Sequence, residues 1–187
     1  MGIKYIYFTP SLPMVYPNNV IIFVFMEKDM IKSWKETTIG WNESPIAKNE
    51  KNDCVVLTFS NVFNIHYDTA HWIVKKYFGR VNRDGVTNFP SKLNNFINGG
   101  NKIGDKGLTP VGTKVGNYHL LHYLVKSRGK MVMRHMTVGK FLKDNPQGRF
   151  ILLIKGHAFT IIDGNIVGNT SDHVKLKRRL WMAWRVS

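Results

Sequence analysis

The sequence contains a single cysteine, Cys54, and few acidic residues. One cysteine excludes an intramolecular disulfide and any cysteine-rich zinc or iron–sulfur site, which favours a reducing compartment. The 12 Asp and Glu are outnumbered by 27 Lys and Arg, so the formal net charge is +15. Such a charge attracts nucleic acid, anionic membranes or acidic proteins, but it does not determine a fold.

Long apolar runs are also missing. The longest covers residues 20–26, far short of the roughly 20 residues that a membrane-spanning helix needs. A secretory signal fits poorly, because Pro10, Pro13 and Pro17 interrupt the N-terminal apolar stretch and only Lys4 supplies positive charge before it. We therefore expect a soluble, cytoplasmic protein without membrane association.

The length and composition indicate one domain. At 187 residues and 43% hydrophobic composition, the chain can bury a substantial core. Residues 1–26 carry a single charged side chain, Lys4, and are either a β-rich arm laid on the core or a non-native extension upstream of a natural start at Met26. We expect residues 27–187 to form a single domain with a basic, loop-rich insert at about 80–130.

Two helices are predicted in quick succession. The first begins at Cys54, with Asp53 or Asn52 as its N-cap, and ends at Asn64, because apolar residues recur there at helical intervals (Val55, Val56, Phe59, Val62, Phe63). The second is capped by Asp68 and ends at Gly79, with Trp72, Ile73, Tyr77 and Phe78 as its apolar members. Cys54 therefore lies in the first turn of a helix.

The rest of the chain predicts loops and then an antiparallel sheet. Residues 80–118 are rich in glycine and indicate long loops, and a short helix is expected from Thr137 to Lys143. Strands are predicted at 150–154, 157–162, 165–167 and 174–186, with Asp163-Gly164 as a hairpin turn. Helices followed by an antiparallel sheet indicate an α+β fold.

Cysteine chemistry is the best-supported chemistry of the sequence. The positive end of a helix dipole lowers a thiol pKa, and Cys54 occupies that position. His157, at the start of a strand, is the candidate proton acceptor. A two-residue turn would place Thr170 opposite His157, whereas a type I turn with a bulge at Gly164 would place Asn169 there. We adopt the second register, because it sets an amide beside the imidazole.

These segments resemble a known family. Residues 52–54 opening a helix, residues 137–148, residues 156–164 and Asn169 are similar to the small papain-like cysteine-peptidase-type proteins common in bacteriophages and mobile elements. The resemblance covers roughly residues 50–186. It implies a papain-like fold, with N-terminal helices packed on a C-terminal antiparallel sheet. It also implies a catalytic triad formed by Cys54, His157 and Asn169, and a host cytoplasmic location if the protein is phage-encoded.

One feature of papain-like enzymes is missing. These enzymes typically supply an oxyanion-hole donor from a Gln several residues before the cysteine, and residues 45–52 contain no Gln. The substitute donors are Asn49, Asn52 or the backbone N–H of Cys54. Because losing one such donor typically costs on the order of 100- to 1000-fold in turnover, the activity depends on such a replacement.

Two functions follow as alternatives. The first is a cysteine hydrolase, either a peptidase or an amide-bond hydrolase, that acts through an acyl-enzyme on a peptide or protein substrate, which can be acidic, without a metal or an organic cofactor. The second is a catalytically inactive protein of the same fold, an effector that binds nucleic acid or an acidic host protein through its basic loops.

The basic residues are concentrated in the middle of the chain. Residues 80–149 contain 13 Lys and Arg against three Asp, a net charge of +10. This segment can contact phosphates or an acidic partner, or it can simply keep the protein soluble. His119 and His122 have a spacing that could suit a metal, but they lie on a stretch that we interpret as helical and lack a cysteine or carboxylate neighbour, so we predict no metal site. We assign no role to His66 or His71.

Overall fold

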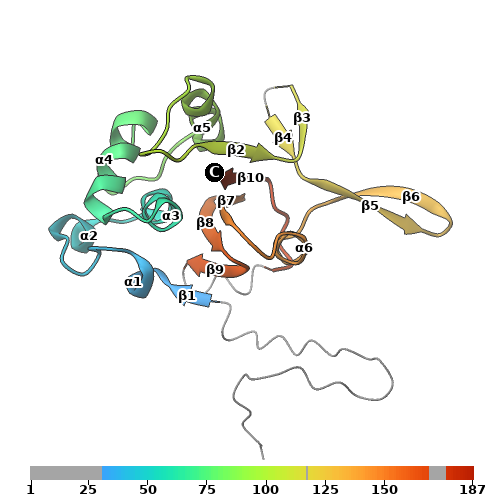
Figure 1. The fold of residues 1–187 in the computed structure, drawn as a ribbon, viewed down its shortest axis with the longest axis horizontal. Helices are drawn as coiled ribbons and strands as arrows, with labels where there is room; N and C mark the ends of the chain where they lie inside the picture. The colour runs from blue at the N-terminus through green and yellow to red at the C-terminus, as the bar shows by residue number, and fades with distance from the viewer. Residues whose placement is uncertain (1–30, 117, 169–175) are drawn as a thin grey trace, which may run out of the picture.

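The structure is a computed structural model that describes residues 31–116, 118–168 and 176–187. It confirms an α+β fold in which most helices precede an antiparallel sheet in the chain (Figure 1). The helices are α1 (Trp34–Thr37), α2 (Pro45–Asn49), α3 (Cys54–Phe63), α4 (Tyr67–Phe78), α5 (Phe89–Asn98) and α6 (Val138–Asp144). In the described part of the chain no helix is both long and apolar enough to span a membrane.

The main sheet has six strands in the order β1-β9-β8-β7-β10-β2. β1 pairs in parallel with β9, and every other neighbouring pair is antiparallel. Its strands are β1 (Ile31–Ser33), β2 (Leu108–Val111), β7 (Arg149–Ile154), β8 (His157–Ile162), β9 (Asn165–Gly168) and β10 (Met182–Val186). Two small two-stranded sheets lie beside it, formed by β3 (Thr113–Val115) with β4 (Tyr118–Leu120) and by β5 (His122–Ser127) with β6 (Lys130–His135).

α3 is the central helix of the core. It packs on β7, β8 and β9 on one side and on α4 on the other, and α5 packs on α4 (Figure 1). Every residue of α3 after Cys54 is buried, including the polar residues Thr58, Ser60 and Asn61, so the helix is enclosed by the core on all sides. The sequence predicted this helix correctly, including its end at Asn64, which adopts the left-handed conformation.

Polar contacts fix α3 in place at two points. The hydroxyl of Thr160 on β8 donates to the carbonyl of Thr58 over 3.2 Å. At the C-terminus of the helix, the guanidinium of Arg149 on β7 donates to the carbonyls of Val62 and Asn61. These carbonyls have no partner within the helix, so Arg149 supplies both hydrogen bonds and a favourable charge. The start of α3 is thereby held over the start of β8.

Several predictions for individual elements are wrong. The N-cap of α4 is His66 rather than Asp68, because the His66 ring accepts from the Asp68 backbone N–H. Residues 80–118 contain α5 as well as β2, which joins the main sheet by pairing with β10. The last strand begins at Met182, since Leu176, Lys177 and Arg178 form a turn region instead of the predicted strand. Other predictions hold, including α6 with its Thr137 cap and the left-handed Gly79 that ends α4.

The hairpin register also differs from the one that we adopted. Ile162 pairs with Asn165 and Ile161 with Ile166, which leaves a two-residue loop. Asp163 and Gly164 both have positive φ, of 47° and 76°, as a type I′ turn requires. This turn matches the twist of the flanking strands without a bulge. The bulged register, which supported Asn169, is therefore wrong, and Asn169 itself lies outside the described residues.

Candidate active site

Cys54 and His157 meet at one end of the core. Cys54 is the first residue of α3 and is half-buried, and His157 is the first residue of β8. Their side chains are hydrogen-bonded, and the backbone N–H of Ala158 also donates to the Cys54 sulfur. Because α3 packs along β8, two residues about a hundred positions apart become direct neighbours.

The surroundings of Cys54 lower the pKa of its thiol. Burial is the largest single influence and raises this pKa, but the hydrogen bond and charge of His157 and the N–H of Ala158 together outweigh it. The charge of Asp53 acts in the opposite direction and raises the pKa. The net lowering favours the thiolate, which is the nucleophilic form of cysteine.

Two aromatic rings contact the imidazole of His157. The Trp34 ring, from the first position of α1, lies with its centroid 5.8 Å from that of His157 at an interplanar angle of 48°. The Phe159 ring stacks at 6.0 Å and 17°. Both rings are buried, so they restrict the orientation of the imidazole beside Cys54. No local sequence pattern indicates this role of Trp34, because its contact with His157 is tertiary.

A pocket of about 850 Å³ opens at the two residues. This size lies within the range of ligand-binding clefts. Cys54, His157 and Trp34 line it, together with the N-terminal ends of α3 and α5 and residues near the ends of β4, β7 and β10. Trp181, which precedes β10 and is 44% exposed, also lines the pocket. The pocket gives a substrate access to the cysteine.

The two asparagines considered as oxyanion donors are placed differently. Asn52 lines the pocket, but its side-chain amide donates to the carbonyl of Arg83 over 3.3 Å. The Asn49 amide donates to the carbonyl of Pro45 over 3.1 Å, and Asn49 is not among the pocket-lining residues. The backbone N–H of Cys54, at the start of α3, is one of the N–H groups that a helix cannot pair internally. It is the candidate with the most suitable position.

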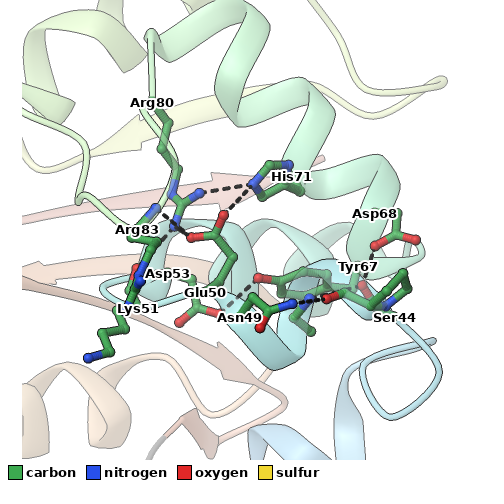
Figure 2. A network of polar contacts seen from close by, with 12 residues as sticks. Ser44, Asn49, Glu50, Lys51, Asp53, Tyr67, Asp68, His71, Arg80 and Arg83 are labelled. Atoms are coloured by element: carbon green, nitrogen blue, oxygen red, sulfur yellow. Dashed lines mark hydrogen bonds and ion pairs between the residues drawn. The ribbon is translucent and has the colours of Figure 1, made fainter.

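A buried ionic cluster joins the segment that leads into Cys54 to residues of α4 and of the segment after it (Figure 2). Arg80 donates to Glu50 over 2.7 Å, and the His71 ring lies 3.2 Å from the other Glu50 oxygen and 3.0 Å from Arg80. Arg80 also donates to the carbonyl of Lys51, and the backbone N–H of Arg83 donates to Glu50. The cluster therefore ties residues 50–51 to the segment that follows α4.

The pKa of Glu50 reflects this environment. Burial is the largest influence and raises the pKa, but hydrogen bonds from Arg80 and from the Arg83 N–H, the charge of Arg80 and the contact with His71 lower it to about 2. Glu50 is thus ionised at neutral pH and paired with a buried guanidinium. No pattern in the sequence indicates this cluster, because Glu50 and Arg80 are 30 residues apart. His71, which the sequence left without a role, is a member of it.

Asp53 does not act as the predicted side-chain cap. It occupies the N-cap position of α3 but makes no capping hydrogen bond with its side chain. Its carboxylate instead accepts a hydrogen bond of 3.0 Å from the Tyr67 hydroxyl on α4. Burial raises the pKa of Asp53, while the bond from Tyr67 lowers it in part. Figure 2 shows this pair beside the ionic cluster.

No group of three or more His, Cys, Asp or Glu side chains in the described ranges could hold a metal ion. His119 lies on β4 and His122 on β5, so the helix that we expected for this stretch is wrong. His122 contacts His135 across the β5–β6 pair, with ring centroids 4.7 Å apart.

Comparisons with protein-family models, with curated proteins and with solved structures found no match to this chain.

Proposed function

We propose that this protein is a cysteine hydrolase of papain-like type that cleaves a peptide or another amide bond. The observation that carries the proposal is the hydrogen-bonded pair of Cys54 and His157, which lines an open pocket and in which the thiol pKa is lowered. A nucleophile at a helix start, packed over a sheet strand that bears the base, supports the papain-like assignment.

The proposed reaction has two halves. His157 accepts the Cys54 proton, and the sulfur forms a bond to the carbonyl carbon while the oxygen becomes an oxyanion. The protonated imidazole then donates its proton to the leaving amine as the C–N bond breaks, which leaves an acyl-enzyme. Water, deprotonated by His157, attacks the thioester and releases the carboxylic acid and the Cys54 thiol.

The remaining roles in the proposed reaction are those of the oxyanion donor and of the groups that orient the imidazole. The oxyanion lies within reach of the helix N-terminus in this proposal, so the Cys54 N–H is its donor. The orientation of the imidazole is held by Trp34 and Phe159. Asn169 stays the third member of the triad on the resemblance alone, without support from the hairpin register.

The test is the alkylation of Cys54 by iodoacetamide as a function of pH. The chain has one cysteine, so the reaction reports on this thiol without background. We expect a titration midpoint below the ordinary thiol range, and a higher midpoint in His157→Ala because burial then acts without its main counterweight. A thiol that is inert, or that titrates in the ordinary range in both proteins, would contradict the proposal.

A second measurement addresses the covalent step. With p-nitrophenyl acetate, the protein should release nitrophenolate in a burst and gain an acetyl group on Cys54 that mass spectrometry detects. His157→Ala should slow acylation by about 100-fold or more, the usual contribution of a general base. Cys54→Ser is the matched control and should show no burst. Acetylation elsewhere in the chain at the same rate would contradict the mechanism.

The second candidate is a non-catalytic protein of the same fold that binds through its basic middle segment. The observation that favours it is the β5–β6 pair with its connecting turn, residues 122–135, which carries four Lys and Arg and no acidic residue. If this second candidate is correct, the Cys54 thiol titrates in the ordinary range of a cysteine. Binding to a DNA duplex that weakens steeply with added salt would indicate phosphate contacts, and absent binding would exclude nucleic acid as the partner.

A further inference from the structure

β5 and β6 form a two-stranded ribbon that projects away from the main sheet (Figure 1). Six residues of each strand pair in register, from His122 with His135 to Ser127 with Lys130. Within the described parts of the chain, the sheet that holds these strands has no third member, so each strand presents one unpaired edge. An isolated ribbon of this kind is only marginally stable in water, and an added strand stabilises it.

The base of the ribbon is firmly attached to the core. Leu121 and Met136 flank the two strands and are both buried. The backbone N–H of Met136 donates to the carbonyl of Leu121, and the N–H of Leu180 donates to the carbonyl of Met136. The ribbon is thus a fixed arm, and it starts at His122, two residues after Leu120, which lines the pocket of Cys54.

One face of the ribbon is apolar and exposed. Leu124 pairs with Met133, and Met131 pairs with Lys126, so these four side chains share a face, because directly opposed residues of an antiparallel pair point to the same side. Leu124, Met131 and Met133 are 61%, 62% and 65% exposed. We call these three residues the apolar face. Three large apolar side chains in water on one small surface are characteristic of an interaction site.

The charges around this face have one sign. Lys126, Arg128, Lys130 and Arg134 lie on the ribbon or its turn, and residues 106–143 contain no Asp or Glu at all. A second copy of the ribbon would be repelled by these charges, whereas an acidic strand would be attracted. The charge pattern therefore selects against self-pairing and in favour of an acidic partner.

We propose that the β5–β6 ribbon docks an extended protein segment in which acidic and apolar residues alternate. The segment pairs with an unpaired strand edge, its apolar side chains cover Leu124, Met131 and Met133, and its carboxylates face the surrounding Lys and Arg. Protein interfaces usually have methionine among the residues at their centre and polar or charged residues at their rim.

The observations favour a protein segment over the other anionic partners. Phosphates of nucleic acid would engage the cations but would leave the apolar face in water. An anionic membrane is disfavoured because the tip of the ribbon is Arg128-Gly129, flanked by Ser127 and Lys130, so the apolar face lies behind a charged turn. The proposal rests on the ribbon alone and does not depend on catalysis by Cys54.

The experiment starts with a random peptide display library selected against the full chain as the Cys54→Ser variant, which binds without cleaving. We expect enrichment of peptides that alternate Asp or Glu with apolar residues. The most enriched peptide then serves as a fluorescent probe. Selection that yields no acidic and apolar consensus overturns the proposal.

Three variants locate the binding of that probe. Replacing the apolar face (Leu124→Ser, Met131→Ser, Met133→Ser) should weaken binding at least about tenfold, because central apolar contacts carry most of the affinity. Val125→Ser with Val132→Ser alters the opposite face and is the matched control, with less than about threefold expected. Lys126→Gln with Lys130→Gln should weaken binding and reduce its dependence on salt.

Two further readouts keep the result unambiguous. The same ribbon variants are also made with Cys54 restored. Their thermal unfolding midpoint and their Cys54 alkylation rate should match those of the parent chain, because the ribbon meets the core only at its base. Equal binding of the probe by the apolar-face variant overturns the proposal. The proposal is also overturned if the parent chain binds a random DNA duplex or phosphatidylserine vesicles more tightly than it binds the probe, and the apolar-face variant abolishes that binding. If Cys54 proves unreactive while the probe still binds, only the hydrolase proposal fails.

Discussion

The hydroxyl of Tyr67 donates a 3.0 Å hydrogen bond to the carboxylate of Asp53, the residue directly before Cys54. Tyr67 is fully buried on α4, so this bond connects the helix behind α3 to the approach of the nucleophile. It also supplies a hydrogen-bond donor to the half-buried Asp53 carboxylate. The position of Cys54 therefore depends on α4 as well as on α3.

Tyr67→Phe tests this connection through stability. The change removes the Tyr67 donor from the half-buried Asp53 carboxylate, and we expect the free energy of unfolding to fall by about 1–3 kcal/mol. Tyr77→Phe on the same helix is the matched control, because Tyr77 is 42% exposed and its loss should have little effect. Urea unfolding followed by tryptophan fluorescence measures both. Equal stability of the two variants would mean that the bond contributes nothing.

Asp53→Asn tests the electrostatics of the nucleophile. The negative charge of Asp53 raises the pKa of the Cys54 thiol, so its removal should move the alkylation midpoint to lower pH and speed the reaction at mildly acidic pH. The helix should keep its start, since the Asp53 side chain makes no capping bond. Asp144→Asn on α6 should leave the profile unchanged. A midpoint that rises in Asp53→Asn would refute this account of the charge.

The sequence predicted α3 well, for a definite physical reason. Its apolar residues recur at helical intervals and Asn64 can adopt the left-handed conformation that ends a helix, so local signals agree with the final packing. The same holds for the β8–β9 hairpin, which Asp163-Gly164 marks. Its register was mispredicted because Asp-Gly suits both a two-residue type I′ turn and a bulged turn, and the neighbouring strands decide between them.

Other features needed the tertiary structure. α5 has only Phe89, Leu93 and Phe96 as buried residues, and the asparagines and glycines around them suggested a loop. The cluster of Glu50, Arg80 and His71 joins segments that have no sequence pattern in common. Charged residues are normally exposed, so nothing local indicates that these particular ones are buried and paired.

The cluster around Glu50 makes stability depend on pH in a specific range. The folded-state pKa of Glu50 is about 2, against an ordinary value of 4.5 in the unfolded chain. A carboxyl whose pKa is depressed by folding contributes its stability above the unfolded value and loses it as pH falls toward the folded value. The contribution, on the order of 3 kcal/mol, is therefore complete above about pH 4.5 and disappears as pH approaches 2.

Glu50→Gln isolates this contribution. At neutral pH the variant should be less stable than the parent chain by a few kcal/mol, because Arg80 also loses its buried partner. The difference should shrink when the same urea titration is repeated at pH 3, since Glu50 of the parent is then closer to protonation. Glu43→Gln, which changes an exposed carboxylate, is the control. A difference that stays constant between the two pH values would exclude Glu50 as its source.

Arg149 offers a test of how α3 is attached to the sheet. Its guanidinium donates through Nε to the Val62 carbonyl and through a terminal nitrogen to the Asn61 carbonyl. Arg149→Met removes both donors and the charge at the helix C-terminus, and we expect a loss of about 2–3 kcal/mol. Arg149→Lys keeps the charge but lacks the planar fork, so it should recover only part of that loss. Equal stability of Arg149→Lys and the parent would show that the charge alone matters.

Trp34 provides the last test, because it links α1 to the imidazole. Its ring packs 5.8 Å from that of His157, and Trp34→Ala removes one of the two aromatic surfaces that fix the imidazole beside Cys54. We expect the hydrogen bond to Cys54 to weaken, so that the alkylation midpoint moves upward because the burial that raises the thiol pKa is less well offset. Trp34→Phe keeps a ring in place and should retain most of the parent profile. Since a loss of fold would also change reactivity, circular dichroism at the assay temperature must first show both variants folded. If folded Trp34→Ala kept the parent midpoint, the orientation of His157 would have to come from Phe159 and the strand itself, and Trp34 would be an anchor of α1 without influence on the nucleophile.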